Sequence, residues 1–147
     1  MREVLYSPIN GKIKPLDLVN DDVFSKRMLG DGVALIPSDN KILSLVDGVI
    51  KMVYDTQHAI GITTSTGVDI LIHIGIDTVS LKGAPFKTQV RVGDHVRKGT
   101  LLTKVDWDYI YDNGYEKIII IIIINKQINL QKENGFINIG TPLLTIE

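Results

Sequence analysis

Short runs of β-branched and other apolar residues, separated by Gly, Pro, Asn or Asp, follow one another along the whole chain. Almost no stretch repeats its apolar residues with the 3.6-residue period of a helix, so the pattern predicts a mostly β protein. Nine short strands in a chain of 147 residues are typical of a β-sandwich or a partly closed barrel. The expected strands cover residues 11–14, 32–36, 48–53, 59–63, 68–74, 88–90, 101–105, 117–124 and 143–146.

Two short stretches, 21–28 and 106–111, have the pattern of helical turns. The second begins with Asp106, a residue type that commonly caps the start of a helix. Neither stretch is long enough to organise the core, so the fold class stays all-β.

The most apolar stretch is a run of seven isoleucines, residues 118–124. A helix needs about 20 apolar residues to cross a bilayer, so this run is too short to span one. We expect it to be a buried strand at the centre of a sheet.

Two weak internal repeats are visible. The sequence around Ser7, Asn10 and Gly11 resembles that around Ser44, Asp47 and Gly48, and residues 92–102 resemble residues 139–144. In each case a turn precedes a strand. Either a duplicated domain or recurrent turn chemistry explains the resemblance.

The composition predicts one folded domain, residues 1–147, with 44% hydrophobic residues and no cysteine. The absence of cysteine excludes disulfides, thiol nucleophiles and thiolate metal sites, and is compatible with a reducing compartment. Sixteen basic and seventeen acidic residues leave a net charge of −1, which argues against a nucleic-acid partner. The first residues lack the apolar core of a signal peptide, so we expect a cytoplasmic protein.

Two of the three histidines are candidates for chemistry. His73 lies on an apolar strand, on the same face as Asp69 and Leu71, and His58 opens the preceding strand. If the two strands form a hairpin whose turn is centred near residues 65 and 66, His58 lies opposite His73, whereas a slip of one residue separates them. Such a pair can bind zinc through neutral imidazoles, carry a phosphoryl group, or be purely structural. His95 lies in a polar turn and receives no role.

A histidine that carries a phosphoryl group needs one ring nitrogen held by a hydrogen bond and the other free for attack. In this interpretation His73 attacks, His58 donates a hydrogen bond to the phosphoryl oxygens, and Thr56 orients the ring of His58. An apolar rim completes such a site, since it lowers the local dielectric and gives a partner protein a surface to dock on. The candidates for the rim are Phe24, Met28, Leu29, Tyr54 and Val79.

Several segments together carry a resemblance to a known family. The most specific is 73–79, His-Ile-Gly-Ile-Asp-Thr-Val, followed by Leu81 and Gly83. The others are 7–8 with Gly11, 21–25, 30–34 with Pro37, 47–48, 56–60 and 93–94. With these segments the chain resembles the glucose-type enzyme IIA of the bacterial phosphoenolpyruvate-dependent sugar phosphotransferase system, and the resemblance extends nearly end to end.

The resemblance implies an all-β sandwich of mostly antiparallel strands with a duplicated hybrid topology. It makes His73 the phosphoacceptor, with His58 as its partner, and it requires no metal or cofactor, although the same two histidines are possible zinc ligands. It implies a phosphotransferase component that takes its phosphoryl group from HPr and passes it to the enzyme IIB domain of a sugar permease. The protein is then cytoplasmic, peripheral to the membrane through the permease, and a monomer.

The resemblance also assigns residues to the partner-binding surface. Two acidic residues are expected to meet basic residues of the partners, where such rim charges mainly set encounter rate and register. An apolar ring surrounds the histidines. The acidic residues are Asp21 and Asp77, and the ring consists of Phe24, Met28, Leu29, Tyr54, Leu71 and Val79.

Three other interpretations compete with a phosphocarrier. A zinc-dependent hydrolase of the lysostaphin-like group needs a His-x-His pair as well as a His-x-x-x-Asp pair, and no His-x-His pair occurs in the sequence. A biotinyl or lipoyl carrier needs a lysine between methionines after the Gly93-Asp94 turn, where this chain has none. An inactive regulatory or binding module with the same fold is not excluded, although the intact His58 and His73 argue against it.

Overall fold

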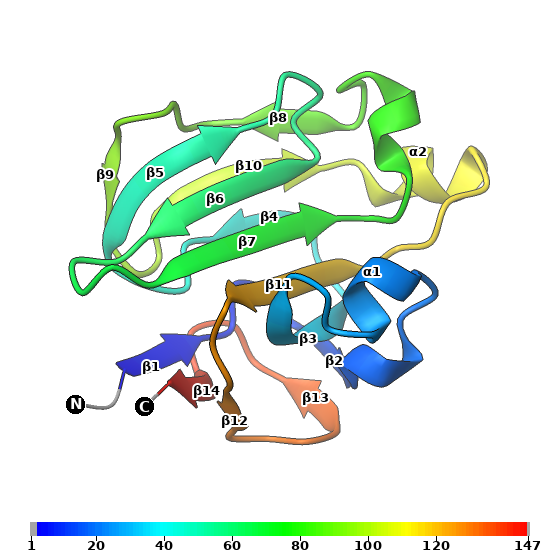
Figure 1. The fold of residues 1–147 in the computed structure, drawn as a ribbon. Coiled ribbons are helices and arrows are strands. Elements are labelled where there is room, and N and C mark those ends of the chain that lie inside the picture. The colour runs from blue at the N-terminus through cyan, green and yellow to red at the C-terminus, as the bar shows by residue number, and fades with distance from the viewer. Residues whose placement is uncertain (1–2, 147) are drawn as a thin grey trace.

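The structure, a computed structural model, describes residues 3–146 and is dominated by short strands (Figure 1). Two α-helices and two 3-10 helices interrupt the strands of this part of the chain: α1 (Asp22–Ser25), α2 (Trp107–Asp112), η1 (Leu16–Leu18) and η2 (Thr78–Leu81). The strands are β1 (Glu3–Tyr6), β2 (Gly11–Lys14), β3 (Gly30–Pro37), β4 (Lys41–Leu43), β5 (Gly48–Val53), β6 (Ala59–Thr63), β7 (Asp69–Ile74), β8 (Phe86–Thr88), β9 (His95–Val96), β10 (Leu101–Val105), β11 (Ile119–Ile124), β12 (Asn129–Leu130), β13 (Gly135–Ile137) and β14 (Pro142–Ile146).

The strands form one sheet of eight and two sheets of three. The large sheet has the order β13-β2-β3-β11-β7-β6-β5-β9, and the small sheets are β1-β14-β12 and β4-β10-β8. Figure 1 shows the sheet of β4, β10 and β8 behind strands β5, β6 and β7, and side chains from both sheets form the main apolar core. The structure is therefore a β-sandwich of antiparallel strands, as expected.

All nine expected strands are present, but some of their bounds were wrong. The predicted strand at 88–90 lies two residues earlier, as β8, and the predicted strand at 117–124 begins at Ile119. Five strands of two to four residues, β1, β4, β9, β12 and β13, were not predicted. They are too short to show a period of two, and each is fixed by pairing with a strand that is distant in sequence.

The isoleucine run forms β11, which pairs with β3 on one side and β7 on the other. Ile119, Ile121 and Ile123 point into the main core, whereas the even-numbered isoleucines 118, 120 and 122 pack in a second apolar cluster with Leu16 and Phe24. A strand that is buried on both faces reads as a continuous apolar run rather than an alternating one. The expectation of a central buried strand is confirmed, and the second cluster explains why residues on both faces of the strand are apolar.

The two internal repeats correspond to two halves with matching hydrogen bonds. The Ser7 hydroxyl donates to the Ile9 carbonyl and the Ser44 hydroxyl to the Val46 carbonyl, both at 2.7 Å. Asn10 Oδ1 accepts from the Ile139 amide, and Asp47 Oδ1 accepts from the Lys98 amide. The strands that follow, β2 and β5, pair in the same manner with β13 and β9. Two pairs of equivalent side-chain hydrogen bonds and the same strand pairing are more than recurrent turn chemistry alone accounts for. The duplicated topology is therefore confirmed.

Both helical stretches begin with an aspartate cap. Asp21 accepts a hydrogen bond from the Val23 amide at 2.9 Å, and Asp106 accepts one from the Tyr109 amide at 3.0 Å. The first helix is shorter than the expected 21–28, because Arg27 has a left-handed backbone with a φ of 55°. The chain then turns back toward β3.

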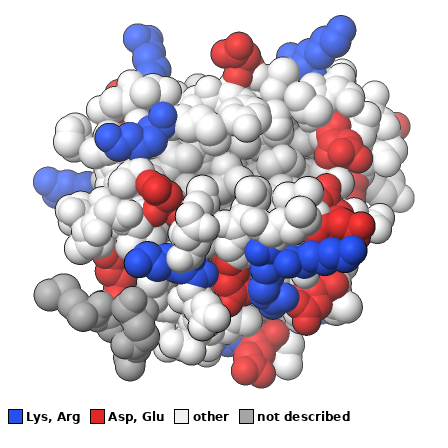
Figure 2. Space-filling view, in the orientation of Figure 1, with Lys and Arg blue, Asp and Glu red and all other residues white. Residues whose placement is uncertain are grey.

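Within residues 3–146 no helix has the length and apolar character needed to cross a membrane. Acidic and basic side chains are interspersed over the face seen in Figure 2, as expected from the net charge of −1. No single-sign field of the kind that binds polyanions covers this face.

Candidate functional site

The β6–β7 hairpin brings His58 and His73 together, with 5.1 Å between the ring centroids. The register is one residue away from the expected one, since Ala59 and not His58 lies opposite His73. The expected consequence, separated side chains, does not follow, because His58 precedes the first residue of β6. It lies in a turn where Gln57 has a φ of 61°, so strand alternation does not govern its direction.

His73 stands on the outer face of β7 between Ala59 of β6 and Ile120 of β11. Its Nδ1 lies 2.7 Å from the carbonyl oxygen of Gly75. A carbonyl oxygen only accepts, so Nδ1 carries the proton and donates it. In the neutral ring the lone pair then resides on Nε2, which is the nitrogen left for nucleophilic attack.

His58 is almost completely buried, with 4% of its surface exposed. The Thr56 hydroxyl lies 2.7 Å from His58 Nδ1, the contact expected from the sequence. The ring of Tyr54 packs edge-on against His58, with 5.0 Å between the centroids. When the hydroxyl donates to Nδ1, the proton of the neutral ring resides on Nε2, where it is available as a donor to a bound oxyanion.

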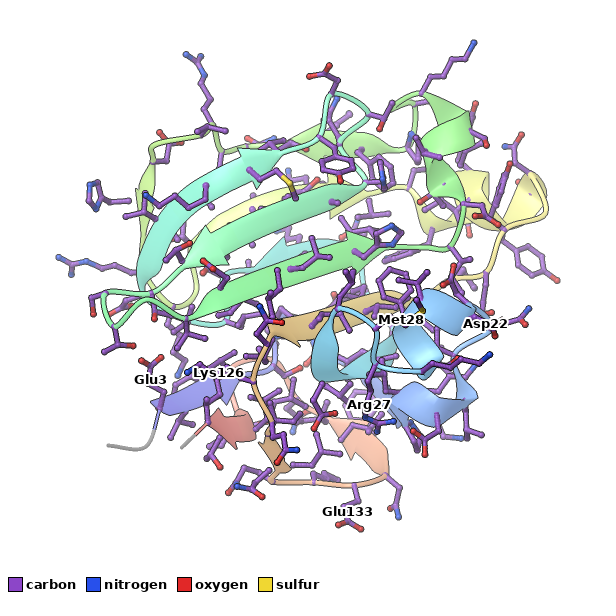
Figure 3. The ribbon with its side chains drawn as sticks, in the orientation of Figure 1. Glu3, Asp22, Arg27, Met28, Lys126 and Glu133 are labelled. Carbon is purple, nitrogen blue, oxygen red and sulfur yellow. The ribbon has the colours of Figure 1, made fainter. Side chains whose placement is uncertain are left out.

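The aromatic ring of Phe24 closes the site on the other side, at 4.9 Å from the centroid of His73. Phe24 belongs to α1, and Arg27, two residues after the end of this helix, fixes it to neighbouring segments. The Arg27 guanidinium donates to Asp31 at 3.0 Å through Nε and to Asp17 through Nη1. Figure 3 shows Arg27 and Met28 beside this short helix.

A cavity of about 200 Å³ lies over the two histidines and is lined by seven residues. Of the residues expected there, Met28, Leu29 and Leu71 do not line the cavity, and Tyr54 contacts His58 without lining it. The lining contains two aspartates and, among the described residues, no lysine or arginine. The lining residues are Asp21, Val23, Phe24, His58, His73, Asp77 and Val79.

Val23 was missed by sequence reasoning. It is 41% exposed and lies between two residues that were predicted for the site, Asp21 and Phe24, in the motif 21–25. The available signal was its position: Val23 is apolar and lies two residues after Asp21, the helix cap that was also predicted for the site. Leu71, in contrast, is half-buried and packs against the second apolar cluster.

Burial lowers the pKa of both histidines below the ordinary value. For His58, the charge of a protonated His73 lowers the pKa further. For His73, the Gly75 carbonyl and the carboxylates of Asp21 and Asp77 raise the pKa, but burial outweighs them. Both rings are therefore neutral at pH 7, the state that a nucleophilic imidazole requires.

Zinc binding through the two histidines was left open by the sequence. Among residues 3–146 no group of three or more His, Cys, Asp or Glu side chains is arranged to hold a metal ion. The histidine pair by itself supplies two nitrogen ligands, whereas a catalytic zinc site takes three protein ligands.

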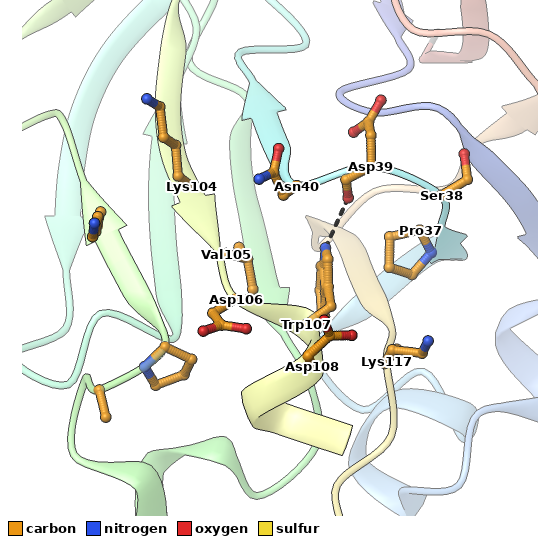
Figure 4. A pocket seen from close by; sticks show the side chains of 13 residues that line it. Pro37, Ser38, Asp39, Asn40, Lys104, Val105, Asp106, Trp107, Asp108 and Lys117 are labelled. Atoms are coloured by element: carbon orange, nitrogen blue, oxygen red, sulfur yellow. Dashed lines mark hydrogen bonds between the residues drawn. The ribbon is translucent and has the colours of Figure 1, made fainter. Parts of the chain in front are cut away.

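A larger hollow of about 690 Å³ lies away from the histidines, between the β3–β4 connection and α2 (Figure 4). Trp107 donates from its indole nitrogen to the carbonyl oxygen of Asp39 at 2.9 Å, which ties α2 to this connection. Lysines and aspartates are mixed along its wall, and no histidine lines it. The titratable groups with lowered pKa values belong to the smaller cavity, so that cavity is the candidate site.

Comparison with known proteins gives a consistent result. The family profile for the phosphoenolpyruvate-dependent sugar phosphotransferase system, EIIA 1, matches residues 3–128. The "PTS system glucose-specific EIICBA component" of Staphylococcus saprophyticus is 45% identical over 121 residues, which are 82% of this chain but 18% of that protein. The chain thus spans less than a fifth of this curated relative.

The solved structure of glucose permease IIA from Mycoplasma capricolum has the same fold, with a TM-score of 0.91 and 36% sequence identity. The match covers 99% of this chain and 96% of that one. These similarities favour the phosphotransferase interpretation over the zinc hydrolase and the inactive module. The site built around His58 and His73 is thus carried by a chain that belongs to the EIIA 1 family of the phosphoenolpyruvate-dependent sugar phosphotransferase system.

Proposed function

We propose that this chain is a phosphocarrier of sugar uptake that holds the phosphoryl group as a phosphohistidine on Nε2 of His73. The observation that carries the proposal is the 2.7 Å contact between His73 Nδ1 and the Gly75 carbonyl oxygen. It fixes the proton on Nδ1 and leaves Nε2 with its lone pair. The low pKa of His73 keeps this nitrogen unprotonated at pH 7.

The donor in this proposal is phospho-HPr. The Nε2 lone pair of His73 attacks phosphorus, a new P–N bond forms, and the bond between phosphorus and the donor atom of HPr breaks. The electron pair of the broken bond stays on HPr. The ring of His73 becomes cationic as the new bond forms, and the Gly75 carbonyl stabilises this charge through the Nδ1–H group. In the second step the phosphoryl group passes by the same displacement to the enzyme IIB domain of a sugar permease.

His58 supports both steps as a hydrogen-bond donor. Its ring contacts His73, and the Thr56 hydroxyl donates to Nδ1, so that Nε2–H is available for the phosphoryl oxygens. A donor already oriented toward developing negative charge costs no reorganisation at the moment of transfer. Neither step calls for a metal ion or another cofactor.

Docking of the partners depends on the surface around the cavity. Asp21 and Asp77 place two carboxylates beside the phosphoacceptor, with no lysine or arginine among the described lining residues. A phosphoryl group therefore faces negative charge from this chain, and the partner has to supply the compensating cations. The apolar side chains proposed for partner contact, Met28, Leu29, Tyr54 and Val79, are exposed, whereas Phe24 and Leu71 belong to the second apolar cluster.

We place the protein in the cytoplasm as a monomer that reaches the membrane only through the permease. The exposed apolar side chains of Val23 and Val79, which line the cavity, fit transient docking of two successive partners. The sugar is bound elsewhere in this scheme, so the chain does not select it.

The test is phosphoryl incorporation from phosphoenolpyruvate in the presence of the general phosphotransferase enzyme and HPr. Wild type and His58→Ala are expected to gain the mass of one phosphoryl group, labile to acid, whereas His73→Ala gains none. His58→Ala is expected to pass the group to enzyme IIB more slowly. His95→Ala is the matched control, because His95 is exposed on β9 and has no role in the site. Absence of label on wild type, with HPr shown to be phosphorylated, contradicts the proposal.

A further inference from the structure

Thr78 is completely buried next to the site and has no part in the steps described above. It is the first residue of η2, two positions after Ile76 and one after Asp77, on the turn that leaves β7. Its hydroxyl donates to the carbonyl oxygen of Ile74. A buried hydroxyl that crosses a turn in this way fixes the backbone that it spans.

The turn that Thr78 spans contains Gly75, the hydrogen-bond acceptor of His73. The peptide between Ile74 and Gly75 is held at both ends, because the Ile74 carbonyl accepts from Thr78 and the Gly75 amide donates to the Ile118 carbonyl at 2.7 Å. The Ile74 amide in turn donates to the His58 carbonyl at 2.7 Å. The Gly75 carbonyl that His73 Nδ1 meets belongs to the next peptide, which lies inside the turn that the hydrogen bond from Thr78 to Ile74 closes.

The side chain of Thr78 also packs tightly against Gly75. A Cβ at position 75 would lie 2.3 Å from Cγ2 of Thr78. Gly75 also has a φ of 76°, a left-handed backbone that favours glycine, inside the turn that Thr78 closes. The methyl group and the hydroxyl of Thr78 thus act together on the residue that orients the phosphoacceptor.

We propose that Thr78 is a positioning residue for phosphoryl transfer: its hydroxyl holds the turn that presents the Gly75 carbonyl, and thereby keeps the proton of His73 on Nδ1. This inference rests on the proposed phosphocarrier function only for its effect on rate. Its effect on the tautomer is a property of the chain alone and is measured without any partner protein.

The test compares three substitutions. Thr78→Val removes the hydroxyl and keeps the shape, Thr78→Ser keeps the hydroxyl and removes the methyl group, and Thr78→Cys replaces the hydroxyl with a weak donor. Thr103→Val is the matched control, because Thr103 is equally buried on β10 and, among residues 3–146, its hydroxyl makes a single long contact, 3.4 Å to the Lys104 carbonyl. Nitrogen-15 NMR of the imidazole rings reports which nitrogen of His73 carries the proton.

In Thr78→Val we expect the Nε2–H form of His73 to become populated and phosphorylation by phospho-HPr to slow about ten- to a hundredfold, a typical cost of a misplaced reacting group. Thr78→Ser and Thr103→Val are expected to keep the Nδ1–H form and the wild-type rate. A role confined to stability would lower the midpoint of unfolding without changing the tautomer.

If Thr78→Val does not fold, Thr78→Cys takes its place in the comparison. A mixture of the two His73 tautomers is then expected in Thr78→Cys and not in Thr78→Ser. A wild-type tautomer in every folded variant that lacks the hydroxyl overturns the proposal, whether or not the protein is phosphorylated. Failure of the wild type to accept phosphate, with the tautomer shifted in Thr78→Val as expected, overturns the phosphocarrier function and leaves the positioning role intact.

Discussion

Gly75 is the residue at which the site tolerates a side chain least, and replacing it with alanine tests this directly. Two costs add up in Gly75→Ala. At a φ of 76°, the left-handed backbone lowers the free energy of unfolding by about 1–2 kcal/mol for a residue other than glycine. The new Cβ would also lie 2.3 Å from Cγ2 of the buried Thr78, and relieving such an overlap in a packed region costs about 1–3 kcal/mol.

Gly67 provides the matched control. It has a φ of 87° in the loop between β6 and β7, but no heavy atom lies within 4 Å of the place where its Cβ would be. Gly67→Ala therefore loses only the free energy that the left-handed backbone costs, about 1–2 kcal/mol. The gain from a less flexible unfolded chain, about 0.4–1 kcal/mol, is common to both variants and cancels in the comparison.

Urea unfolding followed by the fluorescence of the single, buried Trp107 measures both free energies of unfolding. We expect Gly75→Ala to lose about 1–3 kcal/mol more than Gly67→Ala, the cost of overpacking alone. Equal losses in the two variants would refute the reasoning, since they would show that contact with Thr78 adds nothing to the cost at position 75.

Three further predictions follow from the packing and the electrostatics. Because β11 is buried on both faces, Ile121→Ala is expected to lower the free energy of unfolding in urea by about 2–5 kcal/mol, and Ile121→Val by about 0.5–1.5 kcal/mol. Ile36 is 38% exposed, so Ile36→Ala is expected to lower it by less than about 1 kcal/mol. The amides of β11 are expected to exchange with solvent more slowly than those of the edge strands β9 and β13, and faster exchange in β11 would contradict its central place in the sheet. Since the pKa values of His58 and His73 are lowered on folding, the unfolded chain binds more protons than the folded chain around and below pH about 6.5, so the free energy of unfolding falls as the pH falls. The unfolding midpoints at about pH 7.5 and about pH 5.5 are therefore expected to differ less in the double variant His58→Gln/His73→Gln than in the wild type. An undiminished difference would assign the pH dependence to other groups.

The sequence predicted most of the sandwich because its longer strands carry their own signals. Strands β2, β5, β6 and β10 were found with their observed bounds, since each has an apolar pattern flanked by Gly or polar residues. The short edge strands could not be found, because two to four residues show no clear period and their partners are far away in sequence.

The isoleucine run shows the limit of pattern reasoning most clearly. The run predicted burial, but a continuous apolar strand does not say what covers each of its faces. The cover on the second face comes from η1 and α1, two short elements whose apolar residues, such as Leu16 and Phe24, carry no helical period.

The histidine pair was predicted for a reason that proved partly wrong. Strand alternation and an assumed turn placed His58 opposite His73, but the hairpin has another register and His58 lies before the strand. The left-handed backbone at Gln57 restores the contact, and left-handed non-glycine residues give only a weak signal in a sequence. The contact of Thr56 with His58 is local, two residues apart, and was correctly predicted.

The site of attachment on the phosphorylated protein tests the central claim most directly. With nitrogen-15 in the histidine rings, coupling between phosphorus and nitrogen identifies the atom that carries the phosphoryl group. Because Nδ1 of His73 is held by the Gly75 carbonyl, the phosphoryl group is expected on Nε2 of His73. Attachment to Nδ1 of His73, or to either nitrogen of His58, would contradict the account.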